Sequence, residues 1–166
     1  METVSFDLRL GEEPFELPDE ATAVDISTSQ TRINRSYLHT KAVSTCIGFV
    51  AHNSVSRTGL MSHLTAAATT DREVFESALH DLSMIGDPES TELYLIGGAP
   101  EDVYGLTKVQ KDRDFTQMRA AAYLSGLSLP KELLKVNWTE DRSIVDLTLD
   151  CRFGDLMIAR QEAYEY

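Results

Sequence analysis

The amino-acid sequence predicts an α+β fold, a mainly antiparallel sheet or sandwich flanked by helices. Several short apolar or alternating runs follow one another along the chain, whereas only two segments carry helical periodicity. Strand runs with few helices between them favour antiparallel pairing. With 166 residues, of which 42% are hydrophobic and 25% are charged, the chain has the size and composition of one folded unit with a sizeable core.

The first 35 residues are predicted to be an acidic N-terminal extension, and residues 36–166 are predicted to be the folded domain. Residues 1–25 contain eight carboxylates and one cation, Arg9. Residues 4–10 alternate apolar and polar side chains, as a half-buried strand does, and residues 11–18 interrupt the pattern. Residues 19–36 are mostly polar, so no strand or helix is predicted there.

A β-hairpin is predicted next. Residues 41–52 are rich in Val, Ile, Phe and Ala, and residues 59–66 form a second apolar run after a polar stretch. If residues 53–56 are the loop, Cys46 lies directly across from His63 on the same face of the hairpin. A slip of one residue in the pairing would place the two side chains on opposite faces.

Two helices and four strands are predicted for the remainder of the chain. Thr70 followed by Glu73 is a capping-box pattern, after which apolar residues recur at helical spacing as far as Ile85. A second helix is expected from about Asp114 until Gly126 ends it. The predicted strands are residues 92–96, 133–138, 143–149 and 155–159.

The charge distribution argues against nucleic acid as a partner. The formal net charge is −12, which repels phosphate backbones. Residues 26–70 contain no acidic side chain, so the region around Cys46 is the least negative part of the chain. The basic residues in this region are Arg32, Arg35, Lys41 and Arg57.

No membrane insertion and no secretory signal are expected, because the apolar runs are short and the N-terminus lacks a basic and then apolar leader. We therefore expect a cytoplasmic protein, the alternative being an effector that is exported without such a signal. Cys46 and Cys151 are too few for a disulfide framework and are expected to be free thiols, Cys151 as a packing residue. No histidine spacing indicates a metal site, and no cofactor-binding motif is present.

Cys46 opposite His63 is an arrangement suited to nucleophilic catalysis. Directly opposed residues have Cβ atoms about 4.5 to 5.5 Å apart, so an imidazole can take the thiol proton and generate a thiolate. The small residues Ala42, Ser44 and Gly48 on the Cys46 face leave room for a substrate. The competing interpretation is a buried structural cysteine beside a hydrogen-bonded core histidine.

Two segments carry a recognisable spacing, TKAVSTC at residues 40–46 and GLMSH at residues 59–63. In them the chain resembles the bacterial chemoreceptor glutamine deamidase family CheD, which has a threonine six residues before its cysteine and a histidine seventeen residues after it, as here. The resemblance extends to LIGGA at residues 95–99 and to a C-terminal hairpin, and it covers about residues 35–160. The family's Gly-Ser-Cys is Ser44-Thr45-Cys46 in this chain.

The resemblance implies a CheD-like fold and a Cys/His amidohydrolase domain over residues 36–166. It implies that Cys46 attacks a glutamine side-chain amide, that His63 acts as base and then as acid for departing ammonia, and that Thr40 orients the histidine. Water then hydrolyses the thioester to glutamate. The implied enzyme is a protein-glutamine glutaminase without a cofactor, whose partner is a protein substrate, either a chemoreceptor of bacterial chemotaxis or another target. Deamidating toxins related in fold, such as cytotoxic necrotizing factor, share this arrangement.

Two other functions stay open at this point. The same dyad also suits transglutamination or peptide cleavage, because both reactions pass through a cysteine thioester. A CheD-like protein-binding module without turnover would keep the fold while Cys46 is unreactive.

Overall fold

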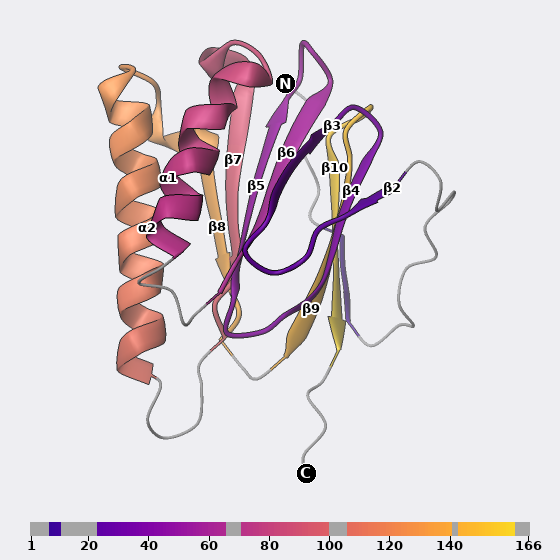
Figure 1. Ribbon diagram of the computed structural model, residues 1–166, viewed down its shortest axis with the longest axis vertical. Coiled ribbons are helices and arrows are strands. Elements are labelled where there is room, and N and C mark those ends of the chain that lie inside the picture. The colour runs from indigo at the N-terminus through magenta and orange to yellow at the C-terminus, as the bar shows by residue number, and fades with distance from the viewer. Residues whose placement is uncertain (1–6, 11–22, 66–70, 100–105, 141–142, 162–166) are drawn as a thin grey trace.

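The computed structural model describes residues 7–10, 23–65, 71–99, 106–140 and 143–161, and two stacked β-sheets with helices on one side make up this part (Figure 1). The helix-covered sheet contains, in spatial order, β3 (Thr31–Asn34), β6 (Thr58–Leu64), β5 (Ile47–Asn53), β7 (Thr91–Gly97) and β8 (Leu134–Trp138). The second sheet contains β1 (Asp7–Leu10), β10 (Asp155–Gln161), β9 (Ile144–Asp150), β4 (Tyr37–Val43) and β2 (Ala23–Asp25). The helices α1 (Asp71–Asp81) and α2 (Leu106–Gly126) lie on the outer face of the helix-covered sheet.

The predicted α+β class, with mainly antiparallel sheets and flanking helices, is confirmed. Among the described strands, five pairings are antiparallel and three are parallel, namely β1 with β10, β2 with β4, and β7 with β8. The strands β7 and β8 are parallel because α2 connects them, and a crossover of this kind returns the chain in the same direction.

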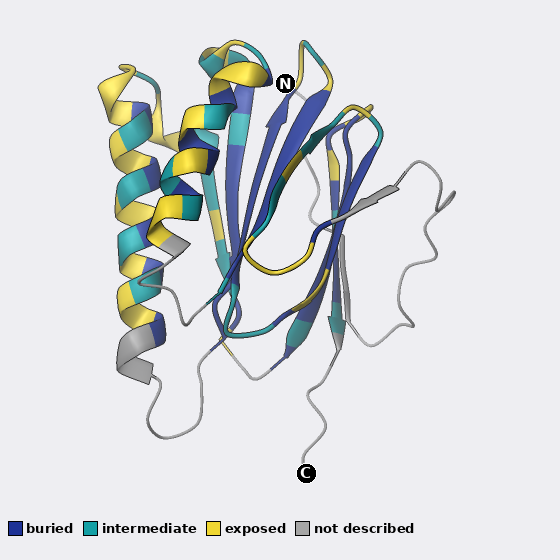
Figure 2. Cartoon of the chain, viewed as in Figure 1, coloured by how far each residue is buried: buried dark blue, intermediate teal, exposed yellow. Residues whose placement is uncertain are grey.

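The core consists of two apolar layers, one on each face of the helix-covered sheet. Successive side chains of a strand point to opposite faces, so Phe49 contacts the helices while Val50 faces the second sheet. The Phe49 ring packs edge-on against Phe75 of α1, with ring centroids 5.2 Å apart. Because both faces of the helix-covered sheet are covered, its strands β5 and β6 are buried along their whole length (Figure 2).

The two sheets approach closely at Gly48. A Cβ atom built on Gly48 would lie 2.4 Å from Leu147 Cδ1 of the opposite sheet. Leu147 is fully buried and has little room to move. A glycine at position 48 therefore sets the spacing of the sheets at this point, and Gly48 is also the residue directly paired with His63.

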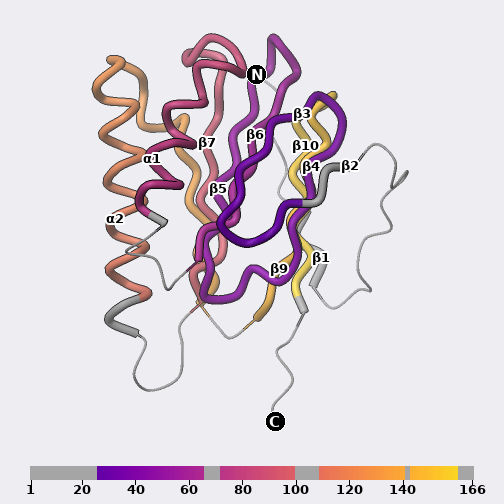
Figure 3. Tube along the Cα trace, in the orientation of Figure 1, coloured from indigo at the N-terminus to yellow at the C-terminus, as the bar shows by residue number. Residues whose placement is uncertain are grey.

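The prediction of one strand over residues 41–52 is wrong. The chain bends at residues 44–46 and passes from β4 in the second sheet to β5 in the helix-covered sheet (Figure 3). A run of β-forming residues does not reveal such a change of sheet, because both halves are apolar and buried. Cys46 consequently lies in a corner between the sheets, immediately before β5 begins.

The predicted hairpin loop is also wrong. Asn53 still belongs to β5 and pairs with Thr58, so residues 54–57 form the loop. The Asn53 side chain makes the turn itself, because its Oδ1 accepts hydrogen bonds from Val55 N (3.1 Å) and Ser56 N (2.8 Å). The register therefore differs by two residues from the predicted one, which preserves the face of every side chain.

Other boundaries differ for reasons of tertiary contact. The polar stretch over residues 19–36 contributes β2 and β3, which pair with β4 and β6. Helix α2 begins at Leu106 instead of about Asp114, and Val109 in the added turns is buried. The remaining predicted strands are present within one or two residues, whereas the first helix ends at Asp81 and continues as the 3₁₀ segment Leu82–Met84. Residues 4–6, Ala66 and the capping residue Thr70 lie outside the described residues.

The close approach at Gly48 predicts a measurable destabilisation by Gly48→Ala. The extra methyl group would overpack the contact with Leu147, and we expect the free energy of unfolding to fall by about 1 to 3 kcal/mol. Gly126→Ala is the matched control, because no atom lies within 4 Å of the added Cβ and alanine favours a helix by about 1 kcal/mol over glycine. Urea unfolding of both variants tests this, and equal or increased stability of Gly48→Ala would contradict it.

Candidate active site

Thr40 and His63 come from different sheets and meet in the layer between them. Thr40 lies on β4 and His63 on β6, and Thr40 Oγ1 is 2.7 Å from His63 Nδ1. Both side chains are buried, with 0% and 4% of their surface exposed. Of the three residues that the sequence singles out, the structure brings these two into direct contact.

The hydrogen bonds of Thr40 determine the tautomer of His63. Thr40 Oγ1 donates its single proton to the carbonyl oxygen of Ile26, at 2.8 Å, because a carbonyl can only accept. The hydroxyl therefore accepts from His63, so Nδ1 carries the imidazole proton in the neutral ring. Nε2 then has the lone pair, which makes it the basic nitrogen. The atom Nε2 is itself buried.

The main chain also holds His63 in place. Ser29 N donates to the His63 carbonyl at 2.7 Å, and His63 N donates to the Gln30 carbonyl at 3.1 Å. These bonds come from the turn that leads into β3. Thr40 thus orients the ring, while this turn and the pairing with Gly48 fix the main chain that carries it.

The sequence predicted that Cys46 lies directly opposite His63, and this is wrong. Gly48 occupies that position. In an unbroken strand Cys46 would be the diagonal neighbour on the same face, at about 7 Å. Residues 44–46 form a bend instead. The position of the thiol is therefore set by the contacts of this bend and not by strand pairing. Cys46 is half-buried and packs against the apolar layer between the sheets.

Two adjacent glycines at the end of β7 hold this bend. Gly98 N donates to the Cys46 carbonyl and Ala99 N donates to the Ser44 carbonyl, both at 2.8 Å. Gly97 has φ +94°, and a Cβ there would lie 2.8 Å from the Cys46 carbonyl oxygen. The two glycines have no side chains, and this lets the cysteine bend pack against the end of β7.

Arg113 of α2 binds the main chain at Gly98, and sequence reasoning missed it. Its Nε donates to the Gly98 carbonyl at 2.7 Å, and its Nη2 donates to the Thr139 carbonyl at 2.6 Å. The guanidinium also lies over the Trp138 ring, 5.5 Å from its centroid. The side chain is buried. An isolated arginine in a helix gives no sequence signal for this role, because the contacts join segments far apart in the chain.

Asp146 of β9 is the second residue that sequence reasoning missed. Its Oδ1 accepts a hydrogen bond from Ala42 N at 2.8 Å. The register between β4 and β9 shifts between Thr40 and Val43, which is a β-bulge, and Ala42 adopts a left-handed conformation with φ +58°. The buried carboxylate thus stabilises an irregular backbone between Thr40 and Cys46. An acidic residue between the apolar residues Val145 and Leu147 of a strand is the sequence signal that could have indicated it.

The other cysteine is unsuited to catalysis. Cys151 is fully buried between the sheets, and burial raises the pKa of its thiol to about 12. His52 lies at that end of the sheets, where its Nε2 donates to the Cys151 carbonyl at 2.8 Å.

In the described part of the chain, no group of three or more His, Cys, Asp or Glu side chains is placed to hold a metal. Within the same residues, no helix has the length and apolarity to span a membrane.

No protein-family model matches the chain, and no curated protein matches it. Among solved structures, the chain is similar to the crystal structure of Bacillus licheniformis hypothetical protein YfiH, with a TM-score of 0.45 and 9% sequence identity. The match covers 67% of this chain and 50% of that chain, so this chain spans about half the length of that structure. The CheD resemblance accordingly rests on the residues of the chain itself.

The hydrogen-bonded pair predicts that Thr40→Val is destabilising and Thr40→Ser is tolerated. Valine leaves the Ile26 carbonyl and His63 Nδ1 without their buried partner, which costs about 1 to 3 kcal/mol. Serine keeps the hydroxyl. Urea unfolding measures the stability, and ¹⁵N NMR of the imidazole should show the Nδ1-protonated tautomer in the unmodified protein. Observation of the Nε2-protonated tautomer would contradict the proposed hydrogen-bond direction.

The buried thiol predicts a pH dependence of stability. In the unfolded chain the Cys151 pKa returns to its ordinary value, so above about pH 9 the unfolded state loses a proton that the folded state retains. This contribution to the free energy of unfolding is complete at neutral pH and decreases as the pH rises. Cys151→Ala should reduce the loss of stability between pH 8 and pH 10 by about 1 to 2 kcal/mol. An unchanged pH profile in urea unfolding would contradict this.

Proposed function

We propose that the chain is a cysteine-dependent protein-glutamine glutaminase, with Cys46 as nucleophile, His63 as base and acid, and Thr40 as the residue that positions the imidazole. One observation carries the proposal: the hydrogen bonds from His63 to Thr40 and from Thr40 to Ile26 direct the lone pair of the histidine to Nε2. A general base must have an unprotonated nitrogen held in a defined direction. The CheD-like spacing of the three residues supports the same assignment.

The proposed reaction begins when Nε2 of His63 takes the thiol proton of Cys46. The thiolate attacks the carboxamide carbon of a glutamine side chain, and N–H groups of the bend stabilise the negative oxygen. His63 returns the proton to the nitrogen, the C–N bond breaks, and ammonia leaves a thioester on Cys46. Water, deprotonated by His63, then attacks the thioester and releases glutamate, with the proton passing back to the sulfur.

The surroundings of Cys46 are compatible with a protein substrate. Residues 44–46 are half-buried and lie in a surface corner, next to the exposed residues Lys41 and Ala42. A glutamine side chain reaches beyond the backbone that carries it, so it can enter such a corner while its chain stays outside. By the CheD resemblance, the target is a chemoreceptor of bacterial chemotaxis or another protein, met in the cytoplasm or after export as an effector.

The proposal predicts that Cys46 is the reactive thiol. Iodoacetamide at pH 7 should label Cys46 at least tenfold faster than Cys151, whose thiol is buried and protonated. His63→Ala should slow the labelling of Cys46, because no base then takes its proton, whereas His52→Ala should leave the Cys46 rate unchanged. Peptide mass spectrometry separates the two cysteines. Slow labelling of Cys46 that does not depend on His63 would contradict the catalytic assignment and favour the protein-binding module.

The reaction class is tested with a glutamine-containing protein such as β-casein as a generic substrate. Deamidation adds about one dalton per site and releases ammonia without added amine, and Cys46→Ser should remove both signals. Incorporation of an added primary amine would indicate a transglutaminase, and cleavage of the chain would indicate a protease. Either result would contradict glutaminase activity while keeping the role of Cys46.

A further inference from the structure

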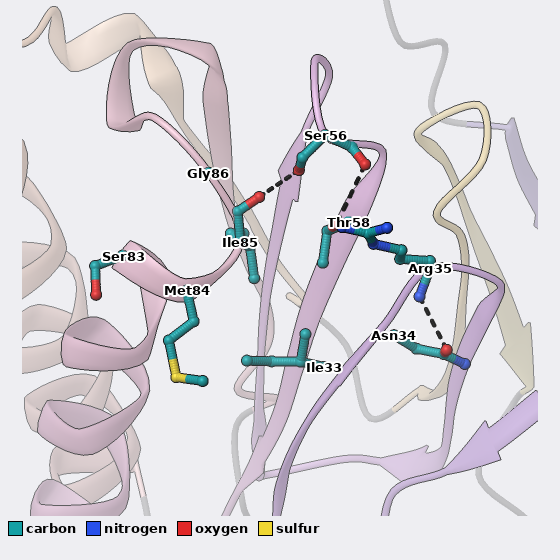
Figure 4. Close-up of a pocket in the computed structure, with 9 residues that line it drawn as sticks. All are labelled: Ile33, Asn34, Arg35, Ser56, Thr58, Ser83, Met84, Ile85 and Gly86. Carbon is teal, nitrogen blue, oxygen red and sulfur yellow. Dashed lines mark hydrogen bonds between the residues drawn. The ribbon is translucent and has the colours of Figure 1, made fainter.

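A cavity of about 560 Å³ lies at the end of the sheets far from Cys46 (Figure 4). It is formed where the turn after β3, the β5–β6 loop and the 3₁₀ segment Leu82–Met84 come together. Strand β5 separates it from the cysteine bend, and seven residues at about 3.3 Å each place the two sites about 20 Å apart. The cavity therefore does not belong to the catalytic corner.

The charge of this cavity is positive. Arg35 is the charged residue among those that line it, and Figure 4 shows its side chain running toward Thr58. Within the described residues, Arg35 forms no ion pair with a carboxylate, in contrast to Arg113, Arg119 and Arg152. A guanidinium without a carboxylate partner is free to bind one from another molecule, in a two-pronged arrangement that suits its geometry.

The hydroxyl groups around Arg35 have already used their donors. The hydroxyl groups of Ser56, Thr58 and Ser83 each donate to a main-chain carbonyl. They present oxygen lone pairs to the cavity but no free proton. An anionic ligand would thus be held mainly by Arg35, which limits the site to one carboxylate-sized group.

An apolar surface lies next to the guanidinium. Met84 is 71% exposed, and it stands beside Ile33 and the buried Ile85. Methionine adapts to differently shaped apolar groups and is frequent at peptide-binding surfaces. The cavity can therefore take one acidic and one apolar side chain at the same time.

The adjoining strand favours an extended partner. Strand β3 is at the edge of the helix-covered sheet, and on its outer side no described strand pairs with it. An exposed edge can receive a further strand through main-chain hydrogen bonds. In an extended chain, residues two apart point to the same side, which places an acidic and an apolar side chain together over the cavity.

We propose that this cavity is a docking site for an extended segment of a protein partner, with an acidic side chain bound to Arg35 and an apolar side chain two residues away against Met84. The site is independent of the chemistry at Cys46, so it stands whether or not the glutaminase proposal does. It gives a function to the basic region around β3 that the catalytic corner does not use.

The test uses the full chain labelled with ¹⁵N and the peptide acetyl-Thr-Glu-Thr-Leu-Thr-amide. We expect shift changes at the amides of Ile33, Arg35, Thr58 and Gly86, with a dissociation constant on the order of 1 mM. Arg35→Gln should weaken binding at least tenfold. Arg152→Gln is the control with the same change of net charge, at a guanidinium already paired with Asp150 at 3.0 Å, and should bind like the unmodified protein.

Three outcomes would overturn the proposal. A peptide with lysine in place of glutamate would produce the same shifts if charge were irrelevant. Arg35→Gln would bind normally if another group held the carboxylate. Inorganic phosphate alone would reproduce the shifts at Ile33 and Gly86 if the cavity were a site for free anions and not for a peptide. Because none of these measurements depends on turnover, failure here is distinguishable from an unreactive Cys46.

Discussion

Between Val43 and Ile47 the chain must pass from one sheet to the other within three residues, and the candidate site depends on this passage. A short crossing requires the two sheets to be close, and Gly48 opposite Leu147 provides that closeness. It also requires an irregular backbone, which the bulge at Ala42 supplies and the Asp146 carboxylate stabilises. As a result, side chains of β4 and β6 face each other across the sheet interface next to the bend.

The polar groups in this interface are organised so that each proton has a defined place. Burial makes an unsatisfied hydroxyl or imidazole costly. His63 Nδ1 therefore donates to the Thr40 hydroxyl, which in turn donates to the main-chain carbonyl of Ile26. The same requirement that stabilises the pair also orients it. The hydrogen bonds that satisfy the buried polar atoms of Thr40 and His63 therefore also give the imidazole the fixed direction that a general base needs.

The two ends of the sheets differ in character. The corner at residues 44–46 has a half-buried thiol and a directed histidine, whereas the opposite end has an arginine that pairs with no carboxylate of the described residues, an exposed methionine and a sheet edge. A protein partner that docks at one end raises the effective concentration of its other segments near the opposite end. The glutaminase and docking proposals are compatible in this way, although they stand separately.

The sequence alone determined the α+β class, the two helices, most strands and Cys46 and His63 as candidates, because apolar periodicity and residue spacing are local properties. Thr40 became a candidate only through the resemblance to the CheD family. The sequence did not reveal that residues 41–52 belong to two sheets, since both parts have the same apolar composition. Only the tertiary structure decided the pairing of Gly48 with His63, the anchoring of the Cys46 bend by Gly98, and the roles of Arg113 and Asp146. These contacts join residues that are distant in the chain, and their energies arise from burial and hydrogen bonding that exist only after the sheets have stacked.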